Sequence, residues 1–239
     1  MLLPLSEIPT NVWPWASGAI VLMIFGIRSL MRSRTSNNIL NSYFGWFGIL
    51  VALAMSGYAF PAFFTTNPQI LRWGLVLGNL SLTGGWLVQS RLLWFIGLRQ
   101  KLSYQWVLIP TLMLASTSWV IEAATSQATI TNHFLFYQYP ASVGVITGSL
   151  VILLLIPLGF LFFYQSLGQP NFLTKFKSSL IGLIYLIMGA SVFVNAALYH
   201  GVDTSETLLY NLIGFGLLVI VLLLPALAPP PTKGSRRSP

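Results

Sequence analysis

The feature that most constrains this chain is a series of apolar stretches, each about as long as a bilayer's hydrocarbon core is thick. A helix needs roughly 20 apolar residues to cross a core about 30 Å thick. Several stretches of the 239-residue chain reach this length, and charged residues make up only 7% of the sequence, against about 25% in typical soluble domains. A water-soluble fold could not cover its surface with so few charges. The sequence therefore predicts an all-α, multi-pass membrane protein.

We expect seven transmembrane helices in one domain over residues 1–228, followed by a disordered basic tail over residues 229–239. The helices are predicted at about residues 12–30, 41–63, 70–98, 104–123, 143–167, 178–199 and 207–227. The N-terminus lacks the basic region and the small-residue cleavage site of a signal peptide, so the first helix is expected to be retained. The longest connection, residues 125–142, is too aromatic for a solvated linker. It should lie along the membrane interface or fold back over the bundle.

The distribution of charge predicts the orientation of the bundle. Eleven of the twelve Lys and Arg residues fall on or near one side of the predicted topology, and only Arg72 falls on the other. By the positive-inside rule, the N-terminus is outside and the C-terminus is cytoplasmic. We expect a cell membrane, most simply the plasma membrane of a prokaryote. The formal charge of +8 is then a topology signal that also favours anionic lipid headgroups, and we expect no nucleic-acid partner.

The run of residues 70–98 carries its polar side chains on one helical face. Arg72, Asn79, Thr83, Trp86 and Ser90 follow one another at spacings of seven, four, three and four, which is the pattern of a single helix face. A polar side chain gains nothing from lipid but finds hydrogen-bond partners among other helices. This helix is therefore predicted to lie among neighbours.

Polar residues on four predicted helices fall toward the outer half of the bundle and form a candidate pocket. The predicted ligand-binding residues are Asn79, Thr83, Trp86, Ser118, Glu122, Asn195, Tyr199 and Asn211. Such a pocket suits a small neutral or amphipathic ligand. The alternative is that the Asn, Ser and Thr side chains only join helices through hydrogen bonds worth about 0.6 kcal/mol each. Trp86 could likewise pack at a close helix crossing, and Arg72 could pair with Glu122.

Catalytic and cofactor chemistry finds little support in the sequence, so we do not expect an enzyme. The absence of cysteine excludes disulfides, thiolate nucleophiles and iron–sulfur ligation. His133 and His200 lack the spacing typical of zinc sites, so we expect no metal site. No histidine lies deep in a predicted span to ligate haem, and no carboxylate lies at mid-membrane depth to carry protons. The sequence indicates no particular cofactor.

Three functional classes remain open. The first is an accessory or scaffold subunit that binds membrane protein partner subunits, which the short loops favour. The second is a facilitator or transporter of a small neutral solute, which the polar face and Pro157, a residue expected to kink its helix, favour. The third is a sensor that passes a signal to a separate partner through its cytoplasmic loops.

The topology and length are similar to those of two membrane families. Seven helices with an outward N-terminus resemble the sugar facilitators built from three helices, one linking helix and three more. The basic first loop, followed by GWFGILVALAMSGYAF, resembles the seven-helix sensory regions that precede bacterial histidine kinases. The first resemblance implies solute transport, and the second implies signalling.

Overall fold

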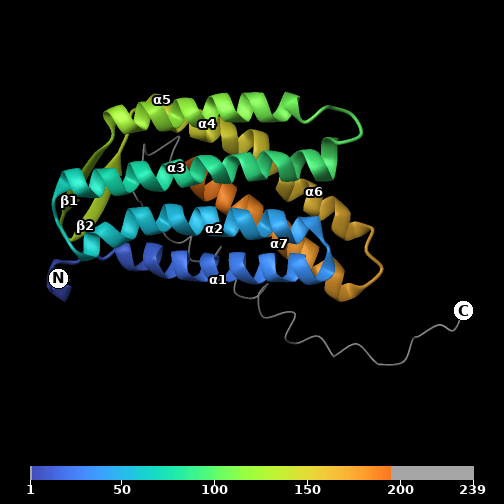
Figure 1. Ribbon diagram of the computed structural model, residues 1–239, viewed down its shortest axis with the longest axis horizontal. Helices are drawn as coiled ribbons and strands as arrows, with labels where there is room; N and C mark the ends of the chain where they lie inside the picture. The colour runs from blue at the N-terminus through green and yellow to red at the C-terminus, as the bar shows by residue number, and fades with distance from the viewer. Residues whose placement is uncertain (1, 195–239) are drawn as a thin grey trace, which may run out of the picture.

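The computed structural model describes residues 2–194, which form a bundle of long helices with a β-hairpin at one end (Figure 1). The long helices are α1 (Val12–Ser36), α2 (Ile39–Ala59), α3 (Pro68–Leu93), α4 (Gln105–Thr125), α5 (Ala141–Leu150), α6 (Ile156–Leu167) and α7 (Phe172–Phe193). Short 3-10 turns, η1 (Leu5–Glu7) and η2 (Phe60–Phe63), and π-helical turns, η3 (Trp94–Leu98) and η4 (Val151–Leu155), flank them. The hairpin strands are β1 (Gln127–Thr131) and β2 (Phe134–Gln138).

Five helical segments in the described residues are long and apolar enough to cross a membrane. They are Val12–Ser36, Ile39–Phe63, Gln105–Thr125, Ala141–Leu167 and Phe172–Phe193. Helix α3 is equally long, at 26 residues, but polar side chains such as Arg72, Gln89 and Arg91 make it less apolar. The described part of the chain is thus mostly helical and compatible with a membrane-embedded bundle. The predicted last span, 207–227, and the tail, 229–239, lie outside the described residues.

Helix α3 turns its polar face into the bundle, as the sequence predicts, while residues such as Trp73 and Leu77 on its other side are exposed. It packs against α2 on one side and α4 on the other, and it has more buried residues than α1, α2, α4 or α7. Arg91, near its end, is partly buried. Its guanidinium lies over the rings of Trp94 and Tyr104, 4.5 and 4.3 Å from their centroids. Cation–π contact therefore holds this charge close to the end of the span.

The two ends of the bundle differ in charge. The connections α1–α2, α3–α4 and α6–α7 lie at one end, which we call the basic end (Figure 1). Its cations lie in or beside these connections and include Arg28, Arg32, Arg34, Arg99, Lys101, Lys175 and Lys177. The opposite end carries the N-terminal residues, the α2–α3 connection and the hairpin, and we call it the hairpin end.

The hairpin is the one departure from an all-helical fold in the part of the chain that the structure describes. Its strands pair antiparallel from Gln127 with Gln138 to Thr131 with Phe134, so only Asn132 and His133 form the turn. Both turn residues have positive φ, 51° and 61°, as a tight two-residue hairpin turn requires. The aromatic connection therefore folds back over the bundle, which is the second of the two expected arrangements.

The span that contains Pro157 is broken into two helices by a π-helical turn. Helix α5 ends at Leu150, the turn η4 follows, and α6 begins with Pro157 in its first turn. Proline lacks the N–H that an α-helix needs, and a wider turn accommodates the carbonyls left before it. The structure therefore places a π-helical turn directly before Pro157, the position at which the sequence predicts a kink.

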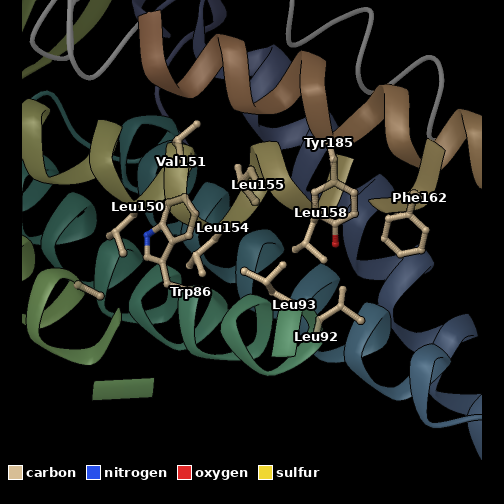
Figure 2. Packing of buried hydrophobic residues seen from close by; sticks show 11 residues of the cluster. Trp86, Leu92, Leu93, Leu150, Val151, Leu154, Leu155, Leu158, Phe162 and Tyr185 are labelled. Carbon is tan, nitrogen blue, oxygen red and sulfur yellow. The ribbon is translucent and has the colours of Figure 1, made fainter. Parts of the chain in front are cut away.

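The largest apolar cluster joins α3 to the α5–α6 span and α7. Figure 2 shows the Trp86 indole beside Leu150 and Leu154, with Tyr185 farther along the cluster. The Tyr185 hydroxyl donates a 2.9 Å hydrogen bond to Gln89 Oε1, and Gln89 is fully buried. A polar contact between α3 and α7 therefore lies beside this apolar cluster. Trp86 belongs to the cluster and lies in the middle part of the bundle, between its two ends.

Candidate functional site

A cavity of about 240 Å³ lies beneath the hairpin, and we call it the hairpin cavity. Its walls come from α2, α3, α4, α5 and α7, together with Trp15 of α1 and two tyrosines at the end of the hairpin. Five of the eight residues predicted from the sequence line it, namely Asn79, Thr83, Trp86, Ser118 and Glu122. The other three, Asn195, Tyr199 and Asn211, lie outside the described residues.

Helical periodicity explains why these five residues come together. Asn79, Thr83 and Trp86 follow at four- and three-residue steps on α3, so they stack on one face of that helix. Ser118 and Glu122 are four residues apart on α4, and both are buried. Because α3 and α4 pack side by side, the two faces form adjoining walls of the hairpin cavity.

A hydrogen-bonded network forms the polar edge of the cavity. The Tyr58 hydroxyl on α2 donates to Asn79 Oδ1 on α3, and the Glu122 carboxyl group on α4 lies beside the Asn79 side chain. The Tyr137 hydroxyl from the hairpin donates a 2.9 Å hydrogen bond to the Tyr58 carbonyl oxygen. The network therefore joins three helices and the hairpin, and it keeps Glu122, which is only 4% exposed, beside polar partners.

The hydroxyl groups of the lining have partners of their own. Thr83 Oγ1 donates to the Asn79 carbonyl oxygen at 3.0 Å, within α3. Ser118 Oγ lies 3.4 Å from Thr147 Oγ1 of α5, so this pair bridges two walls of the cavity. These hydroxyls offer hydrogen bonds that a ligand could share, while the remaining lining is largely aromatic and aliphatic.

Several lining residues were not predicted from the sequence, above all Tyr58 and Tyr137. Tyr137 is buried, and its ring stacks on Trp15 with the ring centroids 5.9 Å apart. Burial raises the pKa of the Tyr137 phenol, so the group stays a neutral hydrogen-bond donor. Leu135 and Tyr137 alternate with less buried residues along β2, but the run FLFYQ has no matching alternation of polar and apolar residues that would have placed Tyr137 facing inward.

Arg72 does not form the expected ion pair with Glu122. Its guanidinium donates instead to the carbonyl oxygen of Ala123, the next residue along α4. Its Nε atom is buried without a hydrogen-bond partner. Arg72 therefore joins α3 to the end of α4, and the Glu122 carboxyl group faces the cavity with Asn79.

The lining of the hairpin cavity combines a few polar groups with aromatic side chains. A cavity with one polar edge and aromatic walls is typical of small-molecule sites, and the lining residues are held by packing between several elements. Comparison of the whole chain with models of known protein families and with curated proteins finds no match.

Proposed function

We propose that this chain is a non-catalytic membrane protein that binds a small neutral or amphipathic ligand in the hairpin cavity, as an accessory subunit of a membrane assembly. The observation that carries the proposal is the polar edge formed by Tyr58, Asn79 and Glu122 in a largely apolar cavity. An accessory role is favoured by short connections, since only Asn37 and Asn38 separate α1 from α2.

The size and lining of the cavity limit the ligand. Its volume of about 240 Å³ lies just below the roughly 300–1,000 Å³ of typical small-molecule sites, so the ligand is small. Its polar group would exchange hydrogen bonds with Asn79 and Glu122, and its apolar part would pack against Trp86 and Trp119. The hydroxyls of Thr83 and Ser118 contact a carbonyl and another hydroxyl rather than a general base, which favours binding without catalysis.

Labelling of a single introduced cysteine tests whether the cavity is open to the outer side. The chain has no cysteine, so Ser118→Cys places the only thiol in the cavity wall. We orient the hairpin end outward by the positive-inside rule. A charged, membrane-impermeant thiol reagent should therefore modify Ser118→Cys in right-side-out vesicles, and not when applied to the other side.

The matched control for this experiment is the neighbouring residue Thr117. Its side chain is exposed on the outside of the bundle at the same depth as Ser118, so Thr117→Cys should face lipid. A thiol in lipid forms little thiolate and should stay unmodified. Equal labelling of the two variants, or labelling of Ser118→Cys from the basic side alone, would contradict an outward-opening cavity.

A facilitator for small neutral solutes is the second candidate, and one residue favours it. Met188 of α7 lines the hairpin cavity and also a second cavity at the basic end. The two cavities therefore meet at one flexible side chain, as they would in a pathway that is closed at a single constriction. The π-helical turn before Pro157 adds a second element at which the bundle could bend.

Substitution of Met188 distinguishes a facilitator from a binding subunit. If solute passes this side chain, swelling of proteoliposomes in glycerol or a similar neutral polyol should become several-fold faster with Met188→Ala. With Met188→Trp it should fall to the rate of empty liposomes. Met113, which is 64% exposed on α4, provides the control, since Met113→Trp should leave swelling unchanged. If wild type, all variants and empty liposomes swell at the same rate, the protein is not a facilitator for these solutes.

A further inference from the structure

A second cavity, of about 280 Å³, lies at the basic end between α1, α2 and α7, with Leu155 of η4 in its wall. We call it the basic-end cavity. We propose that it binds one anionic phospholipid, with the phosphate held by Arg28, Arg32 and Lys177 and part of an acyl chain inside the cavity. This site shares only Met188 with the hairpin cavity and does not depend on the function proposed there.

The cations at the cavity have no acidic partner at this end of the described chain. Arg28 and Arg32 are one helical turn apart on α1, and Lys177 faces them from α7, close enough to Arg32 for their charges to repel. Both carboxylates of the described residues, Glu7 and Glu122, lie toward the hairpin end. Three converging positive charges without a counterion favour a bound anion.

The inner wall of the cavity is apolar, which favours a lipid over a free anion. Leu22 and Ile184 are buried there, and the rings of Phe25 and Phe47 complete the wall. A basic mouth above an apolar interior matches the two parts of a phospholipid. Basic pockets between helices near the cytoplasmic surface are known to bind anionic headgroups in this way.

The charge of the remaining sequence argues against the chain's own tail as the occupant. The predicted tail, residues 229–239, carries only positive charges, at Lys233, Arg236 and Arg237. Their positive charge would add to that of the cavity mouth instead of neutralising it. A bilayer, by contrast, supplies anionic lipid at the depth where these cations lie.

The test measures lipid retained by the purified full-length chain, with native mass spectrometry after addition of phosphatidylglycerol or phosphatidylcholine. One phosphatidylglycerol should remain bound under conditions that remove phosphatidylcholine. Each cation contributes roughly fivefold in affinity near a membrane surface, so Arg32→Gln with Lys177→Gln should weaken binding about 25-fold. The matched control, Arg34→Gln with Lys175→Gln, removes two charges from the same end outside the cavity lining and should change binding less than twofold.

A second set of variants tests the acyl chain and keeps the proposal open to contradiction. Ile184→Trp, or the smaller Ile184→Phe, should fill the cavity and abolish phosphatidylglycerol binding, whereas Leu183→Trp on the exposed side of α7 should not. Inorganic phosphate at millimolar concentration should not displace the lipid. Equal loss in the control double variant would indicate diffuse surface charge. Binding that survives Ile184→Phe, or displacement by phosphate, would indicate a headgroup site without an acyl chain, and each result overturns the proposal.

Discussion

Replacing Gly57 with alanine is expected to destabilise the bundle by about 2–3 kcal/mol, at the upper end of the cost of overpacking. A Cβ atom at Gly57 would lie 2.6 Å from the Gly74 carbonyl oxygen and 2.9 Å from the Gly78 Cα atom. Both are backbone atoms of α3, which cannot rotate aside as a side chain can. Helices α2 and α3 would therefore have to separate, and Gly74 and Gly78, four residues apart, would lose their close approach to α2.

The separation of α2 from α3 should also disturb the polar edge of the hairpin cavity, because Tyr58 follows Gly57 directly and its hydroxyl donates a hydrogen bond to Asn79. Denaturant titration in detergent measures the loss, with Gly85→Ala as the control. A Cβ atom at Gly85 would lie 3.7 Å from the nearest atom of the Phe47 ring, which is an ordinary contact. Similar losses of unfolding free energy in Gly57→Ala and Gly85→Ala would mean that α2 and α3 pack less closely than the structure indicates.

Replacing Asn11 with alanine should release the hairpin from the bundle at a cost of about 2–6 kcal/mol. Asn11 Nδ2 donates to the Leu135 carbonyl oxygen at 2.7 Å, and the Leu135 N–H donates to Asn11 Oδ1 at 3.0 Å. Leu135 is fully buried, so Asn11→Ala leaves two buried backbone groups without these partners, each costing about 1–3 kcal/mol.

Hydrogen exchange of the hairpin amides provides the measurement for the Asn11 variant. Exchange over residues 127–138 should accelerate by at least an order of magnitude in Asn11→Ala, because the strands lose their attachment to the start of α1. Asn38 serves as the control, since its exposed side chain accepts a hydrogen bond from the Leu40 N–H at the start of α2. Asn38→Ala should cost about 1 kcal/mol and leave hairpin exchange unchanged. Unchanged exchange in Asn11→Ala would show that other contacts hold the hairpin.

The helices and two adjoining walls of the candidate site could be predicted from the sequence because both depend on local periodicity. The spacing of Asn79, Thr83 and Trp86 identified the inward face of α3, since an apolar environment leaves few places for polar side chains. Ser118 and Glu122 on α4 followed from the same reasoning. Their convergence at one cavity required no information beyond the helical period and the adjacency of consecutive helices.

The hairpin and the roles of Tyr58 and Tyr137 could not be predicted in the same way. The turn at Asn132 and His133 lacks glycine, and the aromatic strand FLFYQ fits an interfacial segment as well as a strand. Tyr58 stands among apolar residues on α2, and its importance depends on the close approach of Gly57 to α3. Contacts between distant segments determine both features, and a single sequence does not contain that information.

Mass spectrometry of the gently extracted native protein tests most directly the claim that the hairpin cavity holds a ligand. The intact species should carry a small molecule that Ala115→Phe removes, because Ala115 lines the cavity and is 2% exposed. Ala124→Phe, at an exposed position near the end of the same helix, should retain it. A species without any bound small molecule, or one whose bound mass is the same in wild type and Ala115→Phe, would contradict the account.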